Sequence, residues 1–350
     1  MHSSISISSG GAERTPWRTL RQAGQVLGGV AAALLLLELL CRVLPVSTST
    51  ETGYYIDPLI LTYPPGHTFT TAFGWDLERE RRQRANNYGF LADHKFTRNP
   101  RAVTLIGDSF VEASMLAPGD RLGAQLERRL QGREVYAMGV PGTSLLDYAE
   151  RIRFASQRFG IHDFVLLLEH GDVAQSLCGS GNNDGPCLDS RTLAPRIEKL
   201  PAPGTLKRVL RSSALAQYLF SQLRLDPAGW LHRLAHGAPA GAPLGPHVVS
   251  DLPPRAIDTV LRTFFARIRP YRSSCLILVL MGDAPPGDAV RDHLAAAARA
   301  NGATLIEVGA SLRELTARTG LSVYVSPHDH HLNRLALGVI ADQVAPLSPR

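Results

Sequence analysis

Five short apolar runs constrain the fold of this chain more than any other feature of its sequence. They cover residues 102–107, 134–138, 163–169, 275–281 and 303–308. Each run is almost wholly apolar, as expected for strands of a parallel sheet that is covered on both faces. Amphipathic stretches, which we expect to be helices, lie near residues 119–131, 144–158, 287–301, 310–318 and 333–345. This alternation predicts an α/β domain with a parallel sheet.

The segment from 170 to 273 interrupts the alternation, because it separates two predicted strands by far more than one helix. It contains a predicted helix at 205–224 and a stretch rich in Pro, Gly and Ala. Insertions of this length usually serve as a lid, a substrate wall or a flexible segment. We therefore predict a domain at 102–350 with an insertion at 170–273. Residues 46–101, which are rich in turn signals, are predicted to form an extended stalk that packs onto it.

The N-terminal region predicts a membrane anchor. Residues 26–37 are uninterruptedly apolar, and the apolar character continues to Leu44 around Glu38 and Arg42, which is near the minimum length for crossing a bilayer. Arginines at 14, 18 and 21 precede this run, and the positive-inside rule places that end in the cytoplasm. A cleaved signal peptide and a buried soluble helix are the competing interpretations, but no clear small-x-small cleavage site follows the run.

These features predict where each part of the chain lies. We expect residues 1–23 in the cytoplasm and a signal-anchor transmembrane helix at 24–45. The protein would then be a single-pass protein of the bacterial inner membrane, with everything after the anchor in the periplasm. Cys178 and Cys187 fit this location, because they flank a loop-forming stretch and could form a disulfide in an oxidising compartment.

The composition argues against a nucleic-acid partner. The net charge of +6 comes almost entirely from arginine, since lysine occurs only at 95, 199 and 207. The densest basic cluster, "ERERRQR" at 78–84, contains acidic residues of its own. A face that binds an anionic polymer is usually a contiguous basic patch. We therefore predict no nucleic-acid partner.

The first apolar run ends abruptly in Gly107, Asp108 and Ser109. The simplest interpretation is a strand-to-helix turn, because Gly and Asp favour turns and Ser caps helices. However, ligands of open parallel sheets bind beyond the carboxyl ends of the strands. The segment "SPHDHHLN" at 326–333 precedes the last predicted helix, where it can reach the same edge.

Ser109 and this second segment together predict a catalytic site. A serine hydroxyl becomes a useful nucleophile when an imidazole takes its proton, and that imidazole needs an orienting partner. We predict Ser109 as the nucleophile, His331 as the base and Asp329 as its partner. His328 competes with Asp329 for the orienting role, but a histidine would stabilise an imidazolium poorly. Asp108 is expected to cap the following turn.

The same segment admits a metal-site interpretation. His328, Asp329, His330 and His331 are all of types that bind metals. Adjacent residues rarely converge on one ion, and no ligand from a third region is evident. We therefore predict neither a metal nor another cofactor, and we interpret His330 as a loop residue.

Five segments between residues 86 and 345 resemble, in order, the motif blocks of the SGNH/GDSL hydrolases. They are "NNYGF" at 86–90, "LIGDSFVEA" at 105–113, "YAMGVPGTS" at 136–144, "LLLEHGDVAQS" at 166–176 and "DHHLN" at 329–333. The resemblance implies a flavodoxin-like three-layer α/β/α sandwich and acyl-ester chemistry. It also implies an oxyanion hole formed by the Ser109 amide and Gly142, with the third block at Gly171.

Two positions depart from the family pattern. The third block usually supplies an asparagine that donates to the oxyanion, and Gly171 stands in its place. The loss of one such donor can cost on the order of a hundredfold in rate, unless His170 or a backbone amide substitutes. In addition, the Asp-x-His spacing of Asp329 and His331 resembles the alginate-type O-acetyltransferase branch.

These observations predict a periplasmic, membrane-anchored serine esterase of SGNH type. The expected substrates are acylated small molecules or carbohydrates, with O-acetyl esters on an envelope or exported polysaccharide implied by compartment and family. A polysaccharide O-acyltransferase with the same triad is one alternative. A non-catalytic polysaccharide-binding protein of the same fold is the other, and the missing asparagine favours it.

Overall fold

The structure is a computed structural model. It describes residues 16–180, 185–223, 225, 252–271, 275–282, 287–326 and 329–348. The first 15 residues, most of the Pro/Gly/Ala-rich stretch and His328 lie outside this description.

A five-stranded parallel sheet lies at the centre of the fold. Its strands are β5 (Val103–Gly107), β6 (Val135–Gly139), β7 (Asp163–Leu168), β10 (Cys275–Leu280) and β11 (Thr304–Glu307). The strands are ordered β11-β10-β7-β5-β6, and every neighbouring pair is parallel. In chain order this is the 2-1-3-4-5 arrangement of flavodoxin-like folds. The predicted α/β class is therefore confirmed.

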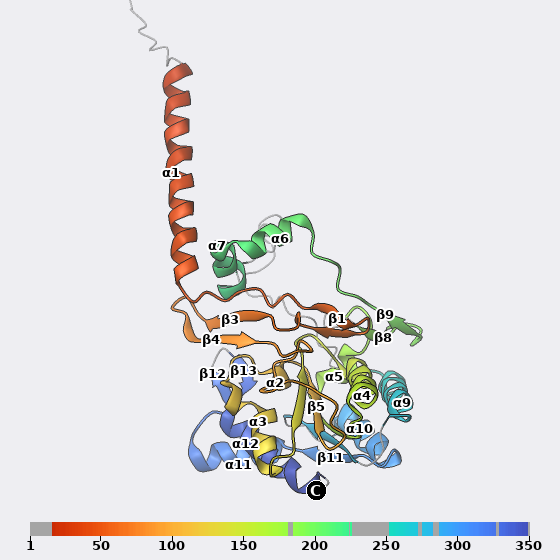
Figure 1. Cartoon of the computed structure of the whole chain (residues 1–350). Helices are drawn as coiled ribbons and strands as arrows, with labels where there is room; N and C mark the ends of the chain where they lie inside the picture. Colours follow the sequence, from red (N-terminus) through yellow and green to blue (C-terminus); the bar gives the residue numbers. More distant parts are fainter. Residues whose placement is uncertain are drawn as a thin grey trace, which may run out of the picture.

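Helices cover both faces of this sheet (Figure 1). One face packs through Ile106, Leu166 and Leu278 onto a cluster that includes residues of α4 (Leu145–Phe159), α9 (Pro254–Ile268) and α10 (Ala289–Ala300). The other packs through Leu105, Val165 and Val279 onto α3 (Leu122–Arg129), α11 (Gly309–Thr319) and α12 (Arg334–Val344). Neighbouring residues of a strand point to opposite faces, so continuously apolar strands bury both. This is the expected three-layer sandwich.

The helix ends agree with the local sequence. At the start of α4, Ser144 and Asp147 form a capping box, and Gly160 ends the helix with φ +75°. Asn333 caps α12 by accepting hydrogen bonds from the amides of Leu335 and Ala336. This cap fixes where the strand before α12 ends.

The segment predicted as an extended stalk contains two antiparallel hairpins. They pair β1 (Gly53–Asp57) with β2 (Ile60–Thr62) and β3 (Thr68–Phe73) with β4 (Glu78–Arg84). The hairpins lie between the sheet domain and α1 (Pro16–Val43), a long helix that extends away from the rest of the molecule (Figure 1). Residues Leu20–Val43 of α1 are long and apolar enough to cross a membrane, a test that a signal sequence also passes.

The predicted insertion contains several short elements. They are α5 (Gly171–Gln175), the hairpin of β8 (Pro186–Leu188) and β9 (Pro195–Ile197), α6 (Thr205–Ser212), α7 (Ala214–Gln217), a π-helical turn (Tyr218–Gln222) and α9. The predicted helix at 205–224 is thus divided into three pieces. α9 packs against α4 in the helical layer of the domain.

A disulfide joins Cys178 to Cys187, as the sequence predicts. Cys187 lies in β8 and is fully buried, and the amide of Cys178 donates to the carbonyl of Leu188 at 2.8 Å. The bond therefore ties the end of the α5 segment to the β8–β9 hairpin.

Replacing both of these cysteines by alanine should lower the free energy of unfolding by about 2–3 kcal/mol, because the bond closes a loop of about ten residues in the unfolded chain. Urea unfolding of the full chain in detergent, followed by circular dichroism, measures this. Cys275→Ala, which removes an unpaired thiol, is the control and should change stability far less. An unchanged double variant would contradict a stabilising role for the bond.

Candidate active site

Ser109 is the first residue of α2 (Ser109–Glu112), directly beyond the carboxyl end of β5, which lies between β7 and β6 in the sheet. Asp108 caps this short helix, since its Oδ1 accepts a hydrogen bond of 2.9 Å from the amide of Phe110. The predicted capping role of Asp108 is therefore confirmed. The cap turns the chain sharply at the sheet edge and places Ser109 at the start of the turn.

Two glycines allow α2 to lie directly on the strand ends. A Cβ atom at Gly139, the last residue of β6, would lie 2.2 Å from the amide nitrogen of Glu112. At Gly107 it would lie 2.5 Å from Cγ2 of Val111. Both contacts are too short for any side chain. Glycine is therefore required where the sheet meets residues 108–112, which we call the nucleophile turn after the predicted role of Ser109.

The structure brings all three predicted triad residues together. Oγ of Ser109 lies 2.9 Å from Nε2 of His331, and Nδ1 of His331 lies 2.5 Å from Oδ1 of Asp329. The same carboxylate oxygen accepts a hydrogen bond of 3.0 Å from the amide of His331. Asp329 therefore fixes both the ring and the backbone of the residue that contacts Ser109.

The segment that carries Asp329 and His331 is a strand, β13 (Asp329–Leu332), where the sequence predicted a loop. It pairs in antiparallel fashion with β12 (Tyr324–Ser326). The ring of His330 lies 5.2 Å from the ring of Tyr324, centroid to centroid, and so faces away from the triad. His328, the predicted competitor of Asp329 for the orienting role, lies outside the described residues.

The environment of His331 favours its charged form. Burial alone would lower the pKa of the ring, but the hydrogen bond and negative charge of Asp329 outweigh it, and the pKa lies above its ordinary value of 6.5. The ring of Phe110 packs against the imidazole at 4.7 Å, centroid to centroid. An imidazolium formed during proton transfer would therefore be stabilised.

Three carboxyl groups lie at the same edge of the sheet, of which Asp108 and Asp172 are buried and Glu169 is half-buried. Burial raises the pKa of Asp108 to about 6 and that of Glu169 to about 7, and the charge of Asp108 contributes to the second shift. The pKa of Asp172 is also well above its ordinary value, because the group is buried near the other two. Asp172 accepts hydrogen bonds from the hydroxyl of Tyr148 and the amide of Glu169. The cluster therefore retains protons near neutral pH.

Arg151 is a fully buried residue of α4 that was not predicted from the sequence. Its Nη1 donates to the carbonyl of Gly107 at 2.6 Å and to that of Met138 at 2.9 Å. Gly107 is the last residue of β5 and Met138 is the last but one of β6, so the guanidinium joins the carboxyl-terminal parts of two neighbouring strands. Arg151 lies three residues after Tyr148 and four before Ala155, both of which are buried; this position on the inward stripe of its helix was an available signal.

The β3–β4 hairpin also supports the site, which the sequence analysis did not predict. Nε of Arg81 donates to the carbonyl of Met115 at 3.2 Å, just after the nucleophile turn. Nη1 of Arg79 donates to the carbonyl of Val325 at 2.6 Å, in the strand that pairs with β13. One hairpin therefore contacts both segments that carry the triad.

A second contact from the lead-in segment reaches α2 itself. The hydroxyl of Tyr63, a fully buried residue that follows β2, donates to the carboxylate of Glu112 at 2.7 Å. The other oxygen of Glu112 accepts from the amide of Ser114 at 3.0 Å. Glu112 thereby holds the end of the nucleophile turn against the lead-in segment.

The two glycines implied for the oxyanion hole follow the carboxyl ends of β6 and β7. Gly142 lies between β6 and α4 and has φ +72°, a conformation that favours glycine. Gly171 is the first residue of α5. Nδ1 of His170 lies 3.4 Å from the carboxylate of Asp288, and neither ring nitrogen makes a hydrogen bond within the described residues.

A cavity of about 780 Å³ lies beside Phe110, whose ring packs against the imidazole of His331. Phe110, next to Ser109, and His330, next to His331, both line it. Apolar side chains from α11 and β13, including Leu312 and Leu332, also line the cavity. Its polar lining groups belong to Glu169, His170, Arg313 and Tyr324. This composition can hold a molecule with both apolar and hydroxyl-bearing parts.

Within the described part of the chain, one group of three side chains has the spacing of a metal site. It consists of Cys178, Cys187 and Glu198. The two sulfur atoms are bonded to each other, so this group does not offer three ligands. Asp329 and His331, part of the predicted metal alternative, are hydrogen-bonded to each other instead.

Comparisons with known proteins identify similar solved structures. No protein-family model and no curated protein matches the chain. The chain is similar to LAE5, an alpha/beta hydrolase enzyme from the metagenome of Lake Arreo, with 14% identity, a TM-score of 0.39, and coverage of 72% of this chain and 96% of that one. It is also similar to a member of the lipolytic protein G-D-S-L family from Veillonella parvula, with 10% identity, a TM-score of 0.37, and coverage of 70% of this chain and 97% of that one. For AlinE4, an SGNH-hydrolase family esterase, the identity is 15%, the TM-score is 0.29, and the match covers 72% of this chain and 98% of that one. Identities and TM-scores this low do not carry residue roles over to this chain.

The pKa of His331 should fall when Asp329 is replaced by Asn, because the substitution removes the negative charge that stabilises the imidazolium. Titration of the histidine ring signals by NMR, assigned through His331→Gln, should give a midpoint above 6.5 in the unmodified protein and a lower one in the variant. Asp292→Asn, which makes the same change on the exposed part of α10, should leave the midpoint in place. Equal midpoints in all three proteins would contradict the assigned interaction.

Proposed function

We propose that this chain is a serine hydrolase of the SGNH type that cleaves acyl esters. The observation that carries the proposal is the hydrogen-bonded series from Ser109 through His331 to Asp329. It lies at the carboxyl edge of a parallel sheet, where such folds bind their ligands. A nucleophile, a base and an orienting carboxylate in this order are the components of acyl transfer through a covalent intermediate.

The proposed reaction proceeds in two halves. Oγ of Ser109 attacks the ester carbonyl while Nε2 of His331 takes the hydroxyl proton, and Asp329 stabilises the resulting imidazolium. The tetrahedral intermediate collapses, and His331 gives its proton to the departing alcohol. Water then attacks the acyl-enzyme with His331 again acting as base, releasing the acid and restoring Ser109.

Backbone amides would stabilise the oxyanion. We assign the amides of Ser109 and Gly142 to this role, because both lie in turns at the edge where the carbonyl would bind. At the third position, Gly171 has no side-chain donor, but it begins α5. Its amide is one of those that an α-helix leaves without an intrahelical partner, so a backbone donor would replace the usual asparagine.

We place the hydrolase domain in the periplasm, attached to the inner membrane by α1 as a single-pass anchor. The length and composition of Leu20–Val43 support the anchor, and the arginines before it support the orientation. The Cys178–Cys187 disulfide supports an oxidising compartment.

For the substrate, we propose O-acetyl esters of an envelope or exported polysaccharide. The cavity beside the triad is far larger than an acetyl group and would hold the sugar. Its polar residues suit hydroxyl groups, and the ring of Tyr324 offers a stacking surface.

Ser109→Ala and His331→Ala should each lower the rate of p-nitrophenyl acetate hydrolysis by on the order of a thousandfold or more, because each removes one member of a unit that acts together. A fluorophosphonate probe should label the unmodified protein on Ser109. His330→Ala, which alters the adjacent ring outside the triad, is the control and should retain most activity and labelling. A protein that is folded by circular dichroism but neither labels nor hydrolyses the ester would instead support the non-catalytic alternative.

Ala317→Trp should narrow the cavity and weaken binding of an acetylated oligosaccharide, raising its KM on the order of tenfold, which corresponds to about 1.4 kcal/mol. The smaller p-nitrophenyl acetate should be affected much less. Arg318→Trp adds the same ring to an exposed neighbouring position outside the cavity lining and should leave both substrates unaffected. If Ala317→Trp changes neither substrate, the cavity does not bind the sugar.

A further inference from the structure

α6 is a short amphipathic helix with no buried residue. Its apolar side chains, Leu206, Val209 and Leu210, are spaced by three and four positions and therefore share one face. Leu206 is 73% exposed and Val209 is 59% exposed. Lys207, Arg208 and Arg211 occupy the remaining surface, and α6 contains no acidic residue. An apolar face opposite basic residues is typical of a helix that lies in a membrane interface.

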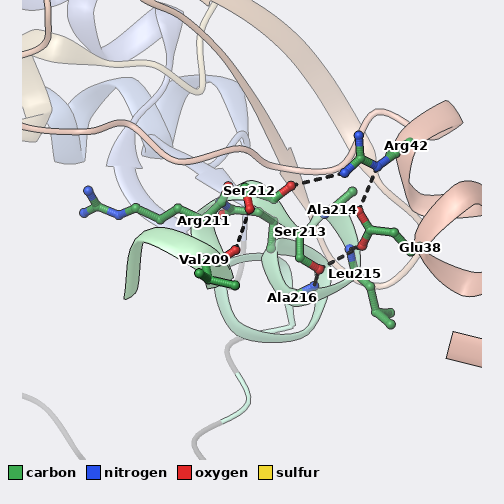
Figure 2. A network of polar contacts seen from close by, with 10 residues as sticks. Glu38, Arg42, Val209, Arg211, Ser212, Ser213, Ala214, Leu215 and Ala216 are labelled. Carbon is green, nitrogen blue, oxygen red and sulfur yellow. Dashed lines mark hydrogen bonds and ion pairs between the residues drawn. The ribbon is translucent and has the colours of Figure 1, made fainter. Parts of the chain in front are cut away.

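The anchor helix holds this region in place (Figure 2). The carboxylate of Glu38 accepts hydrogen bonds from the hydroxyl of Ser213 at 2.8 Å and from the amides of Ala214 and Leu215 at 3.1 and 2.9 Å. These groups form the start of α7, which follows α6 directly. Arg42 pairs with Glu38 at 2.8 Å and donates to the carbonyl of Ser212, the last residue of α6.

The position of Glu38 along α1 sets the level at which these contacts lie. The candidate span of 24 residues is about 36 Å long at 1.5 Å per residue, whereas a hydrocarbon core is about 30 Å thick. Glu38 lies five residues before the end of α1 at Val43, or about 7.5 Å. If the hydrocarbon core begins just after Arg21, about 20 residues at 1.5 Å each place its far boundary near Arg42, about 6 Å beyond Glu38. The junction of α6 and α7 therefore lies close to the headgroup region.

A second exposed side chain lies in the same region. Trp75, at the tip of the β3–β4 hairpin, is 77% exposed. Its carbonyl accepts from the hydroxyl of Tyr218, and the carbonyl of Gly74 accepts from the side chain of Gln222, both at 2.9 Å. The hairpin tip is thus bonded to the turn that follows α7. Tryptophan is enriched at membrane–water interfaces.

We propose that α6 docks on the membrane that α1 spans. Leu206, Val209 and Leu210 would enter the boundary between headgroups and acyl chains, and the three basic side chains would bind anionic phospholipid headgroups. Continuity with the end of the proposed span, together with the charge of α6, identifies a lipid surface as the occupant of this apolar face. The proposal rests on α1 as a membrane span, but it is independent of the chemistry proposed for Ser109.

The test measures the depth of single probes in the bilayer. The full chain, with Cys41→Ala and Cys275→Ala, receives an environment-sensitive fluorophore at Val209→Cys and is reconstituted into phosphatidylglycerol-containing nanodiscs with or without brominated acyl chains. Lys207→Cys, on the opposite face of α6, is the matched control. Leu34→Cys in the middle of α1 is the positive control, and Arg318→Cys on the distant α11 is the negative one (Figure 1).

Docking predicts that the probe at 209 is quenched several-fold more than those at 207 and 318, and less than the one at 34. Replacing Lys207, Arg208 and Arg211 together by Glu should reduce the quenching at 209, while hydrolysis of p-nitrophenyl acetate stays unchanged. An unquenched probe at 209 beside a quenched one at 34 would overturn the proposal. A blue-shifted but unquenched probe at 209 would also overturn it, because a second protein copy would then cover the face. If the probe at 34 is unquenched, α1 does not span the bilayer and the proposal fails with its premise.

Discussion

The guanidinium of Arg151 holds together the part of the fold on which the candidate site depends. It is fully buried and donates hydrogen bonds to the carbonyls of Gly107 and Met138, near the carboxyl ends of β5 and β6. A charge removed from water is costly unless it is paired and hydrogen-bonded. Burial lowers the pKa of Arg151, and the nearby carboxylates of Asp147 and Asp108 oppose this shift by supplying negative charge. The hydrogen bond from Arg151 therefore holds the end of β5, where the nucleophile turn begins.

Three carboxyl groups at this edge of the sheet have raised pKa values. Burial is the main cause for Asp108, Glu169 and Asp172, and repulsion from neighbouring carboxylates adds to the shifts of Glu169 and Asp172. Asp329 behaves differently, because it lies beside His331 and raises the pKa of the imidazole. One edge thus contains partly protonated carboxyl groups near Ser109 and a carboxylate directed at the base. This separation of roles is typical of sites that transfer protons.

The sequence predicted the elements whose signals are local. The five apolar runs became the five strands, and the cap at Asn333 and the capping box at Ser144 agree with the predicted helix starts. The proximity of Ser109, His331 and Asp329 was predictable, because Ser109 directly follows an apolar run and the other two residues precede the last helix. Their catalytic roles stay predictions. The hairpins were not, since β4 reads "ERERRQR" and has no apolar alternation. Its arginines bond to backbone carbonyls of distant segments, a role that no local pattern records. The pKa values of Asp108 and Glu169 likewise arise from burial and neighbours that only the fold creates.

The β3–β4 hairpin connects the region around the end of α1 to the candidate active site. At its tip, Gly74 and Trp75 are bonded to the turn after α7, which Glu38 ties to α1 through the start of α7. Along β4, Arg79 and Arg81 are bonded to the segments that carry the triad. The ladder of backbone hydrogen bonds between β3 and β4 makes this connection short and stiff. An anchor joined to its domain by an unstructured linker would allow the site to vary in height above the membrane. Here the paired strands connect α1 to the candidate site through hydrogen-bonded segments. With α1 as the proposed membrane span, this connection would hold Ser109 at one height above the membrane.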